Sequence, residues 1–194
     1  MGIIIQSGRG SGKSAGVTKK GLLTTYSVVA EDSSEANRCG YAFNAVLPSQ
    51  SPATTACFFH LANTSTGSSP ADFHVFSIEL NLTGARDYVN VYMGQNTTLA
   101  GGTLATPCNM NIGNDVSPPI AYNYGANITG FDTAAKLCGI INIEVSNGSK
   151  IWSPECHIII PPGRCIFMRG TSGPVIFGNV MFFFPDTDTK FVNL

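Results

Sequence analysis

The sequence predicts an all-β protein, an antiparallel β-sandwich of jelly-roll type with an extended N-terminal arm. Its apolar segments are short, rich in β-branched and aromatic residues, and separated by turn residues, which gives about eight or nine strands. No segment has the periodicity of an amphipathic helix. Of the 194 residues, 43% are hydrophobic and only 12% are charged, against about a quarter in a typical domain. This low charge indicates that much of the surface is committed to contacts.

The chain divides into two parts of different composition. Residues 1–21 form a basic, glycine-rich arm without acids, whose cations are Arg9, Lys13, Lys19 and Lys20. Residues 22–194 form the sandwich domain, in which a polar, Gly-rich stretch at about 95–132 is expected to be a long loop. Because the net charge of the whole chain is −1, its charge does not favour a nucleic-acid binder.

The first six strands are expected where β-forming residues are bounded by turn residues. They cover Leu22–Ala30, Tyr41–Leu47, Thr54–Ala62, Phe73–Leu82, Tyr88–Met93 and Lys136–Val145. Residues 73–82 alternate cleanly between two faces, which is typical of a half-buried strand. The side chains expected on the core face of that strand are His74, Phe76, Ile78, Leu80 and Leu82.

The C-terminal segment from Cys156 predicts a strand, a Pro-Pro-Gly turn, a strand, a Gly-rich turn and a final strand over residues 175–184. The final strand is apolar on both faces. One face holds Val175, Phe177, Met181 and Phe183, and the other holds Ile176, Val180, Phe182 and Phe184. Such a strand needs cover on both sides: the opposing sheet on one, and a loop or another subunit on the other. The residues we expect at an oligomer interface are Val175, Phe177, Phe182, Phe183 and Phe184.

The six cysteines are expected to be reduced thiols. None belongs to a C-x-x-C pair, and the apolar run near the N-terminus is too short for a secretory signal, so we expect synthesis in a reducing cytoplasm. In a hairpin whose turn centres on Pro162, Cys156 would lie opposite Met168 and Cys165 opposite Ile159, so the two thiols would not meet. No transmembrane run is expected either.

One stretch imitates a catalytic motif. Residues 7–14 resemble the phosphate-binding loop G-x-x-x-x-G-K-[ST], but Ser7 replaces the first glycine and a poor helix former follows Ser14. The three histidines, His60, His74 and His157, fall in separate strands without metal-ligand spacing. No nucleophile elbow occurs. We therefore expect no enzyme activity, no cofactor, no metal and no small-molecule substrate.

The layout of the chain resembles a known family. The features that carry the resemblance are the Gly-rich run Gly8–Lys13, the strand starts Leu22–Tyr26 and Gly40–Asn44, the strand end His60–Asn63 and the turn Ile160–Gly163. In these the chain resembles the virion structural proteins of tailed bacteriophages, the small β-sandwich proteins that decorate or cement the head or sit in the neck and tail. The resemblance implies a structural capsid decoration or cement protein, found in the virion after assembly in the host bacterial cytoplasm. Its implied partners are the major capsid protein and copies of itself, as a homotrimer, with no nucleic acid and no membrane.

Two expectations follow for the partner contacts. Three consecutive β-formers, Ile3, Ile4 and Ile5, predict an arm strand that adds to a neighbour's sheet edge, with the four arm cations lying on an acidic surface. The alternative is a neck, tail or fibre component that acts as a receptor- or carbohydrate-binding module. Exposed aromatic residues clustered on loops, such as Tyr122 and Tyr124, would be its sign.

Overall fold

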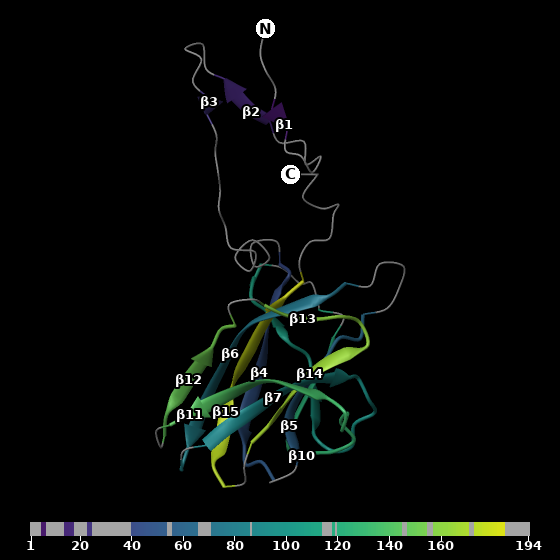
Figure 1. Cartoon of the computed structure of the whole chain (residues 1–194), viewed down its shortest axis with the longest axis vertical. Helices are drawn as coiled ribbons and strands as arrows, with labels where there is room; N and C mark the ends of the chain where they lie inside the picture. Colours follow the sequence, from purple (N-terminus) through teal and green to yellow (C-terminus); the bar gives the residue numbers. More distant parts are fainter. Residues whose placement is uncertain are drawn as a thin grey trace.

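Two antiparallel six-stranded sheets pack face to face in the computed structural model, which confirms the predicted β-sandwich (Figure 1). The structure describes residues 5–6, 14–17, 23–24, 40–53, 56–65, 71–85, 87–113, 118, 120–144, 147–154, 157–170 and 173–184. The strands of the sandwich are rich in β-branched and aromatic residues, as the sequence predicts.

Sheet I has the strand order β12-β6-β15-β4-β9, with β13 beside β6. Its strands are β4 (Ala42–Gln50), β6 (Phe73–Thr83), β9 (Cys108–Asn109), β12 (Ser149–Trp152), β13 (Ile158–Ile160) and β15 (Val175–Phe183). Sheet II has the order β11-β7-β14-β5-β10-β8. Its strands are β5 (Cys57–Ala62), β7 (Asp87–Gln95), β8 (Thr103–Ala105), β10 (Tyr122–Ile128), β11 (Lys136–Ile143) and β14 (Arg164–Arg169).

The strand pairing is nested along the chain. β4 pairs with β15, β5 with β14, β6 with β12 and β13, and β7 with β11. Successive members of this series alternate between sheet I and sheet II. A long antiparallel hairpin rolled up in this way is the two-sheet jelly roll that the sequence predicts.

The stretch at 95–132 is not the long loop that we expected, because it contains the three strands β8, β9 and β10. Tyr122, Tyr124 and Ile128 supply the apolar side chains that make β10 a strand, which pairs with β5 on one side and β8 on the other. β9 pairs with β4 in the other sheet. The Gly and Pro content of the stretch therefore marks short turns between strands.

The main core lies between the sheets and is rich in phenylalanine. The ring of Phe182 lies 5.7 Å from that of Phe43 and 5.1 Å from that of Phe73, between centroids. The inner face predicted for the strand over residues 175–184 is confirmed: Ile176, Val180 and Phe182 of β15 are buried in this core, as is Phe184 directly after the strand. These rings carry much of the apolar area that stabilises the fold.

Strand β6 departs from the predicted alternation. Val75 pairs with Phe182 and Ser77 with Met181, so Phe76 is one extra residue opposite β15. This β-bulge reverses the faces of the strand. Phe73 and Val75 enter the core with Ile78, Leu80 and Leu82, as the burial of all five shows. The expectation that His74 and Phe76 face the core is therefore wrong, and both lie on the outer face of sheet I.

The Pro-Pro-Gly turn does not close a hairpin. β13 pairs with β6 in sheet I, whereas β14 pairs with β5 and β7 in sheet II. The turn carries the chain between sheets and is anchored where the N–H of Gly163 donates to the carbonyl of Asn63 at 2.9 Å. The predicted alignment of Cys165 with Ile159 is wrong, because Cys165 lies opposite Ala62 and Gly94. The other aligned cysteine, Cys156, lies outside the described residues.

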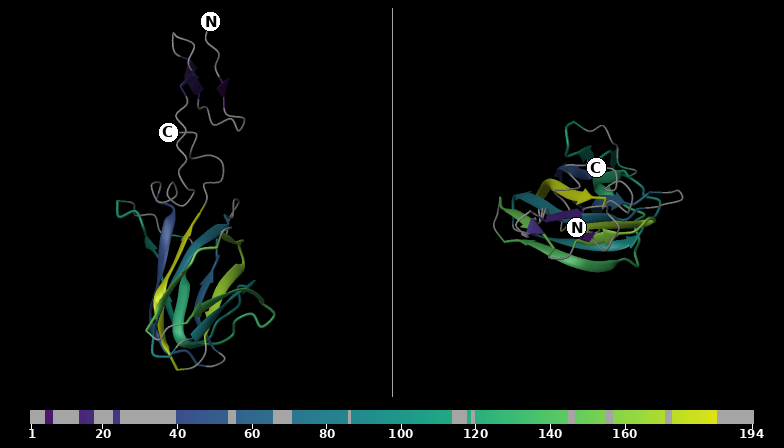
Figure 2. Two further views of the ribbon diagram at one scale, coloured as in Figure 1. Left: turned by 60° about the vertical axis from the view of Figure 1, so that its left-hand side comes forward. Right: turned by 90° about the horizontal axis from the view of Figure 1, so that it is seen from above.

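A third, small sheet has the order β1-β2-β3 and is drawn apart from the sandwich in Figure 1 and in the left view of Figure 2. Its strands are β1 (Ile5–Gln6), β2 (Ser14–Val17) and β3 (Leu23–Thr24). A strand therefore begins at Ser14, where a phosphate-binding loop requires a helix N-terminus. Of the strand expected over Leu22–Ala30, only Leu23–Thr24 falls among the described residues.

Candidate interaction surface

The outer face of sheet I, turned away from the core, is broad and almost without charge. Four apolar side chains are exposed on it, and these are Val46, Ile151, Ile159 and Phe177. Strand register places one charged carboxylate there among the described residues, that of Glu79. That carboxylate accepts a hydrogen bond from Nδ2 of Asn179 at 3.1 Å. The face is therefore almost neutral, with apolar side chains among asparagine and serine side chains, and a low content of charge is typical of the centre of a protein interface.

The five residues predicted at an oligomer interface separate into three groups. Val175 is half-buried, and Phe177 is 36% exposed on the outer face of sheet I. Phe182 and Phe184 lie inside the core between the sheets. Phe183 points to the outer face but is fully buried there. Of the five, Val175 and Phe177 are the ones that offer surface to a neighbour.

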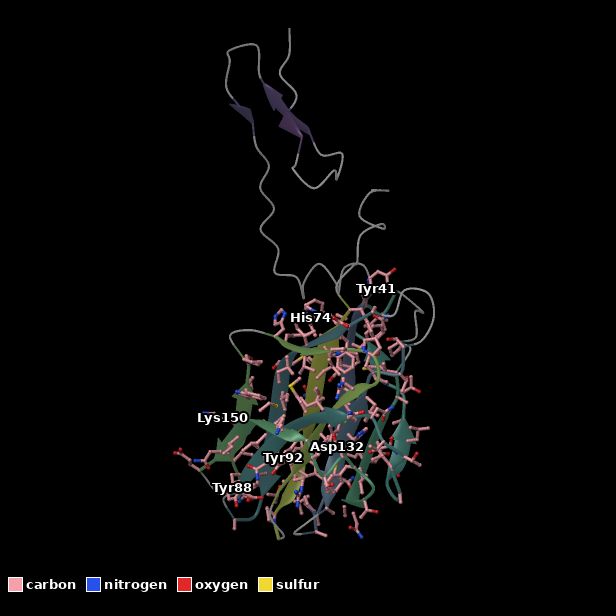
Figure 3. The ribbon with its side chains drawn as sticks, turned by 45° about the vertical axis from the view of Figure 1, so that its right-hand side comes forward. Tyr41, His74, Tyr88, Tyr92, Asp132 and Lys150 are labelled. Carbon is pink, nitrogen blue, oxygen red and sulfur yellow. The ribbon has the colours of Figure 1, made fainter. Side chains whose placement is uncertain are left out.

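The cover over Phe183 comes from the chain itself. Its ring lies 5.2 Å from that of His74, 5.1 Å from that of His157 and 6.0 Å from that of Phe76. Tyr41 also packs on this cluster, and Figure 3 shows Tyr41 and His74 at the same end of the sandwich (Figure 3). The bulge in β6 makes the cluster, because it turns His74 and Phe76 outward.

Two buried acceptors on the outer face of sheet I have no hydrogen-bond partner. They are Oδ1 of Asn44 on β4 and Oδ1 of Asn179 on β15. Leaving such a group unsatisfied costs about 1–3 kcal/mol.

Part of the outer face of sheet II is covered by Leu99, which follows β7, and by the segment between β10 and β11. Leu99 packs there with Phe131 and Ala135 over Cys165 and Phe167. The carboxylate of Asp132 holds the segment between β10 and β11 in place, because Oδ2 accepts the N–H of Gln95 and Oδ1 accepts that of Ala134, both at 2.9 Å. These hydrogen bonds lower the pKa of Asp132. The segment fits closely against Gly94, where an added Cβ would lie 2.8 Å from the Cβ of Ala135.

His60 lies in this second face and is buried. Its ring stacks on Phe167 at 6.3 Å between centroids, and its Nε2 has no hydrogen-bond partner. Burial lowers the pKa of His60 to about 4. The imidazole is therefore neutral at physiological pH and packs as an aromatic ring.

Tyr122 and Tyr124 do not form the exposed aromatic cluster that would mark a carbohydrate-binding module. Tyr122 is buried, and its hydroxyl donates to the carbonyl of Val46 at 2.9 Å, which joins β10 to β4 across the edge of the sandwich. Burial raises the pKa of this hydroxyl. Tyr124 is half-buried and packs against the core.

The arm residues named as partner contacts fall mostly outside the described residues. Ile5 lies in β1, opposite Ala15 of β2. The others, Ile3, Ile4, Arg9, Lys13, Lys19 and Lys20, lie outside. In the described part of the chain, no three His, Cys, Asp or Glu side chains gather as metal ligands. That part also has no helix long and apolar enough to cross a membrane.

Comparison with protein-family models, with curated proteins and with solved structures found no match.

Sequence reasoning missed part of the sheet I surface. The outward position of Ile159 follows from simple alternation with the buried Ile160, so the sequence pattern could have predicted it. Val46 and Ile151 lie in strands whose inner face could be assigned only once their partners were known.

Proposed function

We propose that the protein is a structural virion component, a capsid decoration or cement protein that binds the major capsid protein and copies of itself. The observation that carries the proposal is the almost uncharged outer face of sheet I on a two-sheet jelly roll. Viral capsid domains use this architecture, as do lectins and cupins. A cupin-like role would rest on a metal site and a lectin-like role on exposed loop aromatics, and neither has support among the described residues.

The proposed role is mechanical, because burial of apolar surface supplies the binding free energy. Removal of apolar area from water stabilises a complex by about 25 cal/mol per Å², and a standard interface buries about 800 Å² per partner. Exposed Phe177 and Val46 lie on the adjoining strands β15 and β4 of sheet I, and exposed Ile151 lies on β12, which β6 separates from β15. Copies joined through this face would tie neighbouring capsid subunits together. The expectation that three copies associate comes from the family resemblance.

The self-association is tested by sedimentation of the full chain at micromolar concentration. A stable trimer is expected, and the double variant Ile151→Ser with Phe177→Ser should dissociate at least about thirtyfold more readily, since each side chain contributes about 1–2 kcal/mol. Leu104→Ser is the matched control, because Leu104 is 69% exposed on β8 of the other sheet. A monomeric native chain would contradict the proposal, and so would a Leu104→Ser variant that dissociates as readily as the double variant.

The arm is tested by deletion of residues 1–20. The sandwich should still fold, because both large sheets are built from residues after Gly40. Binding to capsids that lack the protein should fall sharply, and binding of the full chain should weaken as salt rises, since salt screens contacts of the arm cations. If the truncated chain decorates those capsids as well as the full chain does, the arm has no part in attachment.

A further inference from the structure

A second exposed surface lies on the outer face of sheet II, along the edge strand β11. Tyr88, Leu137 and Ile140 are 48%, 51% and 56% exposed there. The register sets Ile140 opposite Asn90, and Asn90 opposite Arg169, across β11, β7 and β14. The surface therefore has a guanidinium beside exposed aliphatic and aromatic side chains. Figure 3 shows Tyr88 and Tyr92 along β7, with Asp132 beyond Tyr92.

The guanidinium of Arg169 lies against two aromatic rings. Its Cζ lies 5.8 Å from the ring centroid of Tyr92 and 5.3 Å from that of Phe131. The side chain is half-buried, and its Nε is enclosed without a hydrogen-bond partner. No ion pair to Arg169 occurs in the part of the chain that the structure describes. Asp132, on the covering segment, already accepts hydrogen bonds from the backbone of Gln95 and Ala134.

This arrangement pre-organises a cation for a planar anion. Stacking over two rings restricts the rotamers of Arg169, so less side-chain entropy is lost when it binds. A guanidinium binds a carboxylate with two parallel hydrogen bonds, which are stronger than neutral ones. Arginine and tyrosine are also enriched at interface hot spots.

We propose that the surface formed by Tyr88, Leu137, Ile140 and Arg169 binds a protein segment that carries a carboxylate between aliphatic side chains. Charge complementarity identifies the occupant: the guanidinium of Arg169, which has no ion pair among the described residues, takes the carboxylate, and the exposed Leu and Ile take its aliphatic neighbours. The inference rests on the proposed function, since it assigns this segment to the capsid protein. Sheet I then joins copies of the chain, and sheet II binds the shell beneath them.

The test is an NMR titration of the isotope-labelled full chain with acetyl-Leu-Glu-Ile-Glu-Leu-amide. The Nε–H resonance of Arg169 and the amides of Tyr88 and Ile140 should shift. The same peptide with Gln in place of both Glu residues should bind about tenfold more weakly, because it loses the charge-assisted hydrogen bonds. Inorganic phosphate at equal concentration should shift Arg169 far less, since it has no aliphatic part.

Variants of the two arginines of β14 provide the matched comparison. Arg169→Gln should abolish the peptide-induced shifts, whereas Arg164→Gln at the exposed end of the same strand should leave them unchanged. Because Arg169→Gln also removes the contact with Tyr92 and Phe131, Arg169→Lys is the second variant. It keeps the charge, so it should retain binding weakened about threefold to tenfold.

Several results would overturn the inference. One is that the Glu and Gln peptides bind equally well, and another is that the Arg169 resonance of the native chain does not shift. The others are that Arg164→Gln loses the peptide-induced shifts as fully as Arg169→Gln does, or that phosphate binds as tightly as the peptide. Dissociation of the oligomer in Arg169→Gln would overturn it too, because the surface would then be a self-interface. The titration needs no capsid and reports on sheet II, whereas the sedimentation experiment reports on sheet I, so the two proposals fail separately.

Discussion

The buried His60 makes the stability of the fold depend on pH. Its Nε2 has no hydrogen-bond partner, and burial lowers its pKa from the ordinary value of 6.5 to about 4. Above pH 6.5 the imidazole is neutral in both the folded and the unfolded chain. Between pH 6.5 and pH 4 the unfolded chain binds one proton more than the folded chain, so acid favours unfolding.

The size of this effect follows from the two pKa values. The difference of about 2.5 units corresponds to about 3 kcal/mol, at about 1.4 kcal/mol per unit. The stabilisation is fully present above pH 6.5, falls by about 2 kcal/mol by pH 5 and is almost entirely lost by pH 4. For a domain of ordinary stability that loss is a large fraction of the total.

The assay is urea unfolding of the native chain and of His60→Phe at pH values from 7 to 4. His60→Phe keeps a ring to stack on Phe167 but cannot bind a proton. The free energy of unfolding of the native chain should fall by about 3 kcal/mol relative to the variant across this range. In the control variant His157→Gln, in the outer cluster, the free energy of unfolding should fall with pH as much as it does in the native chain. A difference between the native chain and His60→Phe that does not change with pH would refute the reasoning.

Three further substitutions or reactions test the packing. Gly139→Ala should destabilise the fold by about 1–3 kcal/mol and shift the fluorescence of Trp152, because the new Cβ would lie 2.6 Å from Cη2 of that ring; unchanged fluorescence would contradict the contact. Asn63→Ala should cost about 3 kcal/mol in urea unfolding, because its buried amide donates to two carbonyls and accepts two further hydrogen bonds; a cost below about 1 kcal/mol would contradict this. Cys57 and Cys165 should resist alkylation at pH 8 until the chain unfolds, because burial raises the pKa of both thiols to about 12; rapid labelling of the native chain by mass spectrometry would count against it.

The sequence carries enough information for the architecture but not for every pairing. Period-two alternation and turn residues predict strands over Phe73–Leu82 and residues 175–184, and the structure has β6 over Phe73–Thr83 and β15 over Val175–Phe183. The inner face of β15 follows from the same alternation. These features depend on local sequence and on burial alone, so a single chain displays them.

The remaining features depend on partners that lie far away in the sequence. The extra residue Phe76 is visible only against β15, because a bulge is defined by two strands. The chain changes sheets at the Pro-Pro-Gly turn because β13 pairs with β6 and β14 pairs with β5. The turn residues alone do not show with which strands the flanking segments pair. The surface around Arg169 was missed for the same reason, since Arg169, Tyr92 and Phe131 come from three separate segments.

The two sides of the sandwich end in strands of very different length, and this limits how the molecule can polymerise. On one side the sheets end in β8 and β9, of 3 and 2 residues. On the other side sheet II ends in β11, of 8 residues, which pairs only with β7 within the described chain. Long runs of free main-chain groups are what allow one sheet to extend into another. Since the described sandwich offers such a run on one side, edge-to-edge growth through it would stop at a closed pair of copies and would not continue into a fibre.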